Sequence, residues 1–221
     1  MGEWSIIWSQ RAAFLDGFLM TLELFILASV ISMIMGLYLL YFTEHNLRAL
    51  NRTIVAFVSL MRTLPFLIFA YLLYYGLPQL GISMSAFTAG LIALSLYHGA
   101  YFFEIFRSQR QVFSAGYIEA AQAQGFSKYK TFRRIILPNI ISGALPLMAN
   151  QLIICLKDTA FLSIITVQEI TAAANSVQAT YFIPFKAFII AIVLYWLISV
   201  IIELATKWLG RYGAKRGMTH V

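Results

Sequence analysis

Long apolar segments constrain this chain more than any other feature of its sequence. A helix needs about 20 mostly apolar residues to cross the hydrocarbon of a bilayer. Five segments reach that length, and with approximate ends they are Phe18–Phe42, Ile54–Leu77, Ala86–Phe106, Ile135–Leu156 and Pro184–Leu209. Of all residues, 61% are hydrophobic and 11% are charged, whereas a soluble domain has about 45–50% apolar and about 25% charged residues. One core cannot bury this surplus, so we expect an all-α integral membrane protein with five transmembrane helices in a single domain over residues 1–221.

Basic residues gather in the first loop, the third loop and the C-terminal tail, while the second loop, PQLGISMS, carries no charge. They are His45, Arg48 and Arg52, then Arg107, Arg110, Lys128, Lys130, Arg133 and Arg134, and finally Lys207, Arg211, Lys215 and Arg216. With five spans these segments all fall on one side of the membrane, which the excess of Lys and Arg identifies as the cytoplasm. We therefore expect the N-terminus outside and the C-terminus inside. The net charge of +7 follows from this topology and does not indicate a nucleic-acid partner.

The segment between the fourth and fifth spans, residues 159–183, is apolar at its start and polar further on. Its polar residues are Gln168, Glu169, Asn175 and Gln178. We interpret it as a helix on the outer face or a re-entrant piece. The alternative is a sixth span, which would place the basic C-terminal tail outside, against the usual distribution of charge.

The sequence contains no recognisable set of catalytic or cofactor-binding residues. Its glycines are not followed by the Lys-Ser/Thr of a phosphate-binding loop, and neither a nucleophile–His–acid set nor a zinc spacing occurs. Cys155 is the single cysteine, which excludes a disulfide within the chain. We expect a non-enzymatic chain without a cofactor of its own.

The third loop, residues 107–134, interrupts the apolar pattern with a short run of good helix formers. Ser114 is a candidate N-cap for a helix that ends before Gly125, a residue suited to the left-handed conformation that closes helices. Ser127 can cap a second helix, which enters the membrane until Pro138 disturbs it. This pattern predicts a compact knob that docks against another surface. A basic amphipathic segment lying on anionic lipid headgroups is the alternative interpretation.

Arg62 lies within the second apolar segment, three residues before Pro65. Charged side chains inside a membrane cost about 2.5–3.5 kcal/mol each on insertion scales and are functional candidates for that reason. A guanidinium can bind a carboxylate through two hydrogen bonds, and a proline-broken helix exposes backbone groups of the kind that line transporter cavities. The alternatives are an arginine that reaches the headgroup region, or one that pairs with Glu104 for structure.

Lys157 and Asp158 end the fourth span side by side. Adjacent residues on a helix point about 100° apart, so the two charges need not neutralise each other. Asn150 precedes Lys157 by about two turns and shares its face. A zwitterionic solute needs one partner of each sign, which these residues and Arg62 supply; alternatively the pair marks the boundary between membrane and water.

A longer motif in the loop carries a family resemblance. The run Glu119-Ala120-Ala121, followed at fixed spacing by Gly125, Ile135, Leu137 and Pro138, resembles the EAA loop of ABC-importer permeases. Further stretches resemble the subfamily for polar amino acids, namely Leu15–Leu22, Arg62–Leu67 with Tyr74–Gly76, Ala100–Tyr101 with Glu104–Arg107, and Leu156–Ala160. The resemblance covers nearly the whole chain and implies the architecture of a type I ABC importer permease. It also implies that the loop couples to an ATPase through Glu119, Ala120, Ala121, Gly125, Leu137 and Pro138.

The same resemblance implies a set of partners. They are a cytoplasmic ABC ATPase dimer that binds ATP and Mg²⁺, a periplasmic or surface amino-acid-binding protein, and a second permease subunit, either an identical copy or a paralogue. The implied location is the bacterial inner membrane, where lipid is the remaining neighbour.

Two positions bear on the solute. The family often has Asn-Glu where Asn150 and Gln151 stand, and a serine-adjacent Asn where Tyr97 stands. Gln151 removes a carboxylate that would pair with a cationic side chain, so we expect a neutral, acidic or unusual amino acid, such as glutamine, glutamate, cystine or an opine. We expect Arg62 to hold the α-carboxylate and Asp158 the α-ammonium, with Lys157 and Gln151 at the side-chain end.

Two further interpretations stay open. His98, in the third span, is more often a hydrogen-bonded packing residue than a proton carrier. A membrane-anchored scaffold or sensor that recruits a partner through the basic loop is the alternative function. Arg62, Glu104 and the prolines Pro138 and Pro146 favour a solute pathway over an anchor.

Overall fold

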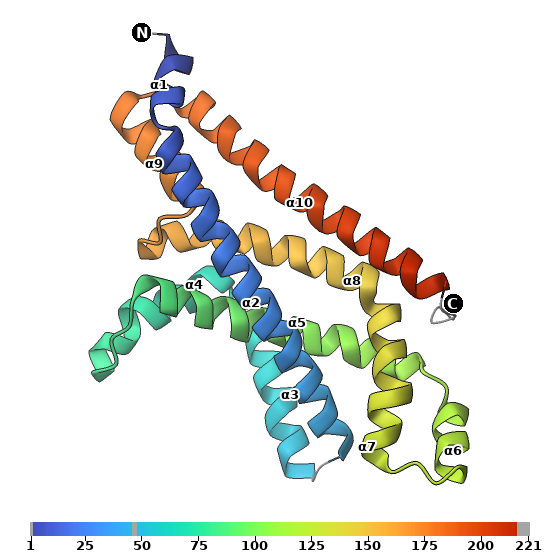
Figure 1. The fold of residues 1–221 in the computed structure, drawn as a ribbon. Helices are drawn as coiled ribbons and strands as arrows, with labels where there is room; N and C mark the ends of the chain where they lie inside the picture. Colours follow the sequence, from blue (N-terminus) through green and yellow to red (C-terminus); the bar gives the residue numbers. More distant parts are fainter. Residues whose placement is uncertain (1, 46–47, 216–221) are drawn as a thin grey trace.

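The computed structural model describes residues 2–45 and 48–215, and within these ranges the chain is helical with no strand. Figure 1 shows long helices that cross at steep angles, with α1 at one end of the molecule and α6 and α7 at the other. The α-helices are α1 (Glu3–Ser9), α2 (Arg11–His45), α3 (Arg48–Thr63), α4 (Phe66–Tyr71), α5 (Ala86–Val112), α6 (Ala115–Ala123), α7 (Lys128–Thr131), α8 (Leu137–Asp158), α9 (Ile170–Tyr181) and α10 (Pro184–Lys215). Four shorter turns of helix join them, namely η1 (Leu72–Gly76), η2 (Leu77–Leu80), η3 (Phe132–Ile136) and η4 (Thr159–Ile165).

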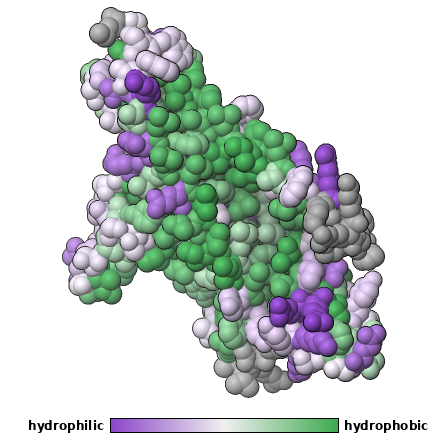
Figure 2. Space-filling view, in the orientation of Figure 1, coloured by the Kyte–Doolittle hydropathy of each residue, from purple (hydrophilic) through white to green (hydrophobic). Residues whose placement is uncertain are grey.

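Four of the described helices are long and apolar enough to cross a membrane, and a fifth span results if one bent pair counts as a single crossing. The four are Arg11–Glu44, Ala86–Val112, Lys128–Ile165 and Pro184–Arg211. Figure 2 shows apolar side chains covering a broad middle belt, with polar side chains gathered toward the α1 end and around α6 and α7. The chain is thus a multi-pass, all-α membrane protein.

The second expected span, Ile54–Leu77, is not one continuous helix. Leu50–Thr63 and Phe66–Leu80 meet at an angle of 104°. Pro65 causes the break, because it has no N–H to bond the preceding turn and its backbone is extended, with ψ at 129°. Beyond Pro65 the chain passes from α4 through the π turn η1 and the 3₁₀ turn η2, which ends at Gly81 with φ at +81°.

The fourth span behaves in the opposite way, since Pro138 does not end it. Helical structure continues from Lys128 to Ile165. The π turn η3 ends at Ile136, two residues before the proline, and its wider ring lets Leu137 N–H bond Phe132 C=O, which relieves the clash of a proline with the preceding turn. Pro146 also lies inside α8, and Figure 1 shows the run from α7 into α8 bending markedly.

Residues 159–183 form η4 and α9, not a long helix. α9 has 12 residues, well short of the about 20 that a span requires, so the alternative of a sixth span is not supported. Glu169 begins α9 by accepting hydrogen bonds from the backbone N–H groups of Thr171 and Ala172, at 2.8 and 2.6 Å. The chain leaves α9 through Phe182, whose φ is +57°.

The α2–α5 pair forms the most extensive helix contact of the described chain. Gly36 lets the two backbones approach, since a Cβ at that position would lie 2.8 Å from Phe103 N and 2.9 Å from Phe102 Cβ. Ser32 adds a hydrogen bond of 3.1 Å from its hydroxyl to Ser95 C=O. This pair is the frame on which α4 and α8 enclose a cavity.

Candidate functional site

A cavity of about 520 Å³ lies between α4, α5 and the end of α8. Its volume falls within the about 300–1,000 Å³ typical of small-molecule sites. It is lined by Pro65, Phe66, Leu67, Tyr97, Tyr101, Gln151, Ile154, Asp158 and Phe161. We call it the polar cavity, because an amide, a carboxylate and two phenols converge on it within segments that cross the membrane.

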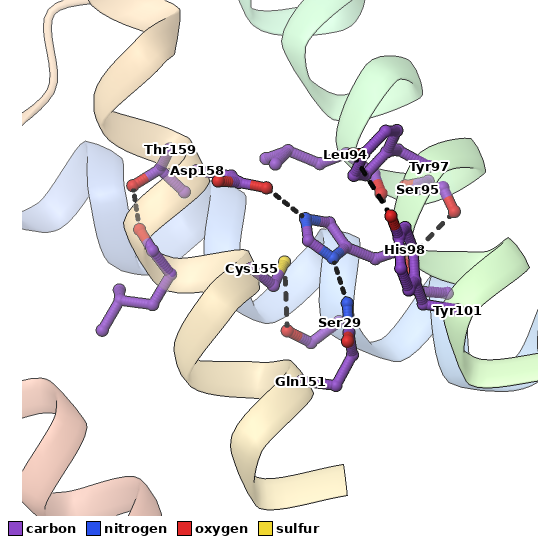
Figure 3. A network of polar contacts seen from close by, with 12 residues as sticks. Ser29, Leu94, Ser95, Tyr97, His98, Tyr101, Gln151, Cys155, Asp158 and Thr159 are labelled. Atoms are coloured by element: carbon purple, nitrogen blue, oxygen red, sulfur yellow. Dashed lines mark hydrogen bonds and ion pairs between the residues drawn. The ribbon is translucent and has the colours of Figure 1, made fainter. Parts of the chain in front are cut away.

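His98 lies behind this cavity at the centre of a hydrogen-bonded network (Figure 3). Its side chain is fully buried. Nδ1 lies 2.8 Å from Gln151 Nε2, and Nε2 lies 3.3 Å from Asp158 Oδ2. The imidazole therefore joins α5 to two residues of α8 that are two helical turns apart.

Aromatic rings form one wall of the polar cavity. Tyr97 and Tyr101 are one turn apart on α5, with their ring centroids 5.2 Å apart and their hydroxyls 3.5 Å apart. Phe66 meets Tyr97 edge to face at 5.3 Å, a geometry that aromatic pairs prefer. The break at Pro65 places Phe66 here, so the bend in the second span shapes the wall.

Arg62 lies at the edge of the cavity, next to Tyr101. Its guanidinium carbon is 5.9 Å from the centre of the Tyr101 ring, and its Nη1 is 3.7 Å from Glu104 Oε1. Glu104 also accepts a shorter bond of 2.7 Å from Arg107. The structural pairing of Arg62 with Glu104 is thus observed, but the Arg62 side chain is 47% exposed and is not locked into this pair.

The structure does not bring Lys157 and Asn150 into the polar cavity. Lys157 lines a separate groove of about 460 Å³ between α8 and α10, which also contains Glu203. Asn150 is exposed and lines neither hollow. The expectation that Lys157 and Asp158 point in different directions is confirmed, since Asp158 lines the polar cavity and Lys157 does not.

The expected loop, residues 107–134, is shorter in the structure, because α5 continues to Val112; the rest forms a small helical unit, α6 followed by a tight turn and α7, which runs on into η3. Gly125 has φ at +77°, and Phe126 N–H bonds Ala121 C=O at 3.0 Å, which is the six-residue closure expected of a glycine-ended helix. Ser127 caps α7 by accepting a bond of 3.3 Å from Lys130 N–H. The predicted roles of Gly125 and Ser127 in the local structure are confirmed.

The predicted cap at Ser114 is wrong in one respect. Ser114 does precede α6 with an extended backbone, but its side chain makes no capping hydrogen bond. Of the residues in the motif, Glu119, Ala120 and Gly125 are exposed, while Ala121 is buried. Leu137 and Pro138 lie half-buried at the start of α8.

His98 is the residue of this site that the sequence underrated. A lone histidine in an apolar segment carries little information, and it is indeed hydrogen-bonded. The signal lay in α8, where Gln151 and Asp158 stand seven residues apart and so share one face. Two polar groups on one face of an intramembrane helix need a polar partner on the facing helix, and His98 provides it.

Apolar helices that surround a polar cavity of this size define a membrane protein built to handle a small polar solute. The matching family model agrees with this class. It covers residues 28–212 and is described as the inner membrane component of a binding-protein-dependent transport system, and the chain belongs to this family. Such permeases work with a substrate-binding protein and with a separate ATPase subunit that hydrolyses ATP; the alternative of a scaffold or sensor is not supported.

Individual relatives are similar over nearly their full length. The probable amino-acid permease protein YxeN of Bacillus subtilis is 32% identical, over 90% of this chain and 90% of its own. The glutamine transport system permease protein GlnP of Escherichia coli K12 is 28% identical, over 95% and 96% of the two chains. In the crystal structure of an amino acid ABC transporter with histidines, one chain matches with a TM-score of 0.84 and 29% identity, over 93% of this chain and 96% of that one.

Proposed function

We propose that this chain is the permease subunit of an ATP-driven importer for a polar amino acid or amino-acid derivative, which a substrate-binding protein delivers. The polar cavity is the observation that carries the proposal. It offers the carboxylate of Asp158 and the amide of Gln151 opposite an aromatic wall, with the cation of Arg62 at its edge. The similarity to an amino-acid permease and to a glutamine permease supports the same class of solute.

A zwitterion in such a cavity needs a partner for each of its charges, because an unpaired charge away from water loses its hydration at a high cost. We assign the α-ammonium to Asp158 and the α-carboxylate to Arg62. Arg62 is held to Glu104 by a contact of 3.7 Å only, while Glu104 has a closer partner in Arg107 at 2.7 Å. The arginine can therefore turn to a solute without leaving an unpaired carboxylate behind.

The far end of the solute meets Gln151 and Tyr97. With one carboxylate in the cavity, already assigned to the α-ammonium, a second cationic group finds no counter-charge among the lining residues. This disfavours arginine and lysine and leaves neutral, acidic and opine-like solutes. Asn150, Glu104 and Lys157 lie outside the cavity, and we propose that they line the route by which the solute enters or leaves.

We further propose that the domain, residues 1–221, crosses the inner membrane of a bacterium five times, with the N-terminus outside and the C-terminus in the cytoplasm. The one-sided distribution of basic loops supports this orientation. Counting the pair bent at Pro65 as one crossing supports the number five. A second permease subunit, identical or paralogous, would complete the membrane part.

For coupling, we propose that the 107–134 loop docks into a cytoplasmic ABC ATPase dimer, which binds the ATP and Mg²⁺. The exposed Glu119, Ala120 and Gly125 provide a small-residue surface on which a partner can approach closely. Ala121 is buried beneath that surface, and we propose that Leu137 and Pro138, at the start of α8, hold the loop against the membrane segment. Exposed aromatic side chains at Tyr117 and Tyr129 supply apolar anchors beside it.

The test is uptake by proteoliposomes that contain the permease, its ATPase and its binding protein, supplied with a panel of labelled amino acids. Arg62→Ala should abolish transport while the binding protein still captures the solute. Arg107→Lys is the matched control, because it keeps a cation beside Glu104 and changes no residue that lines the cavity, so it should transport at close to the normal rate. Gln151→Glu should shift preference toward cationic amino acids. Normal transport by Arg62→Ala would refute the site assignment, and failure of the wild type to transport any amino acid would refute the function.

A further inference from the structure

The buried imidazole of His98 contains a polar atom that the protein leaves unsatisfied. Its Nε2 has no hydrogen-bond partner among the described residues, although Asp158 Oδ2 lies 3.3 Å away in ion-pair range. Leaving a buried donor without a proper bond costs about 1–3 kcal/mol, and such exceptions are uncommon enough to require an explanation. A packing role alone does not supply one.

The contact with Gln151 decides which nitrogen of His98 carries a proton. Gln151 places its amide nitrogen, a donor only, 2.8 Å from Nδ1. Nδ1 must then accept, so a neutral imidazole has its proton on Nε2, on the side of the Asp158 carboxylate. The reverse arrangement, with a proton on Nδ1 and the amide oxygen turned toward it, would set the lone pair of Nε2 against that carboxylate. The arrangement in the structure is therefore the one that suits a neutral ring.

This arrangement fixes what the cavity presents to a solute. The amide nitrogen of Gln151 is bonded to His98, and Gln151 lines the polar cavity. Its oxygen Oε1 is therefore the end of the amide that is left for a solute in the cavity. Asp158 lines the same cavity and is also an acceptor. Between these two residues on α8, Cys155 has its Sγ 4.0 Å from the Ser29 hydroxyl.

We propose that His98 is the positioning residue that sets the specificity of the polar cavity. By binding the amide of Gln151 and facing Asp158, it turns two acceptors toward the solute. The cavity then selects a zwitterion whose side chain ends in an uncharged hydrogen-bond donor, of which a carboxamide is the best-fitting class, over the corresponding carboxylate. The inference rests on the proposed function, since it takes the polar cavity to be the solute site.

The chemistry of the selection is simple. A carboxamide NH₂ donates to Gln151 Oε1, whereas a carboxylate at the same point places two acceptors against each other and repels the charge of Asp158. A site built for a particular hydrogen bond rejects an analogue that cannot form it, because its own polar group is left unpaired. One such bond corresponds to a preference on the order of tenfold.

Two substitutions separate the two contacts of His98. An asparagine side chain reaches the place of Nδ1 and a glutamine side chain reaches the place of Nε2. His98→Asn therefore keeps a partner for Gln151 and loses the one facing Asp158, while His98→Gln does the reverse. The measurement is the binding of labelled L-glutamine to the complex of permease and ATPase without the binding protein, in competition with L-glutamate and L-arginine.

We expect the wild type to prefer glutamine to glutamate by on the order of tenfold or more. His98→Gln should lose most of that preference, because the amide of Gln151 is released to rotate. His98→Asn should keep the preference but bind all three amino acids more weakly. A His98→Gln variant with the wild-type preference, or equal weakening by both variants without any change in preference, would overturn the proposal, since a residue that only packs gives that result.

If neither His98 variant folds, Gln151→Met carries the test, because it removes the amide from a side chain of similar length and leaves the histidine in place. It should lose the preference for glutamine over glutamate, and a retained preference would refute the inference. A wild type that prefers glutamate to glutamine overturns this inference and leaves the proposed function standing, whereas one that prefers arginine overturns both this inference and the proposed exclusion of cationic solutes. A wild type that binds no amino acid would refute both this inference and the proposed function.

Discussion

Replacing Gly36 by alanine tests the close contact that holds α2 against α5. A Cβ at this position would lie 2.8 Å from Phe103 N and 2.9 Å from Phe102 C, and both are backbone atoms. Ordinary contact begins at 3.4 Å, so the two helices would have to separate by about 0.6 Å. Neither phenylalanine can yield instead, because both are fully buried.

Overpacking of this kind costs about 1–3 kcal/mol. In a chain of this length each kcal/mol shifts the melting temperature by about 2–4 °C, so we expect Gly36→Ala to melt about 2–12 °C below the wild type. The measurement is thermal unfolding of the detergent-solubilised protein, followed by intrinsic fluorescence and by the fraction that remains monodisperse.

Gly210→Ala is the matched control. Gly210 lies within α10, and a Cβ added there would meet no heavy atom of the described chain within 4 Å. Alanine in an open helical position is more favourable than glycine by about 0.5–1 kcal/mol, so the control should melt slightly above the wild type. If Gly36→Ala melts at the wild-type temperature or higher, the close approach of α2 to α5 is not a determinant of stability.

Three further predictions concern other parts of the chain. Gly125→Val should lower uptake and stimulated ATPase activity together while the protein still accumulates in the membrane, because a branched side chain disfavours the φ of +77° by about 1–2 kcal/mol; normal ATPase stimulation would remove the proposed coupling role. Burial raises the pKa of Glu169 above its ordinary value of 4.5, despite the hydrogen bond from Tyr195. Because the pKa of Glu169 is higher in the folded chain than in the unfolded chain, its contribution to stability is greatest below pH 4.5 and is lost as the pH rises through the folded-state pKa. Glu169→Gln should therefore flatten the dependence of melting temperature on pH above 4.5, and an unchanged slope would contradict this. A cysteine introduced near Lys215 should react with a membrane-impermeant reagent only after the membrane is opened, and reaction from outside would reverse the proposed topology.

Local chemistry explains what the sequence could predict. Apolar length predicted the membrane segments, and the restricted backbone of proline predicted a broken helix at Pro65. The left-handed turn at Gly125 and the cap at Ser127 follow from neighbours within a few residues. These features depend on short-range geometry, which the order of residues specifies directly.

The features that the sequence did not predict depend on packing between distant parts of the chain. Pro138 was expected to disturb its helix, and a π turn does lie just before it, but the sequence did not predict that the helical run would continue past the proline. His98 and Gln151 are 53 positions apart and meet only because α5 and α8 pack together. Lys157 was placed with the solute on the basis of its charge, whereas the rotation of α8 directs it toward α10.

The uninterrupted helical run from Lys128 to Ile165 has a consequence for how such a chain can vary. The last residues of the 107–134 loop form the start of this run, and Gln151 and Asp158 lie near its other end, so one stretch of helical backbone fixes their relative rotation. Inserting or deleting one residue between Thr131 and Gln151 would turn the cavity side chains by about 100° relative to the loop. A surface loop accommodates a change of length by bulging outward, whereas this segment can accommodate an extra residue only by widening a helical turn, as the π turn η3 does. The length of this segment is therefore constrained together with the side chains at its two ends.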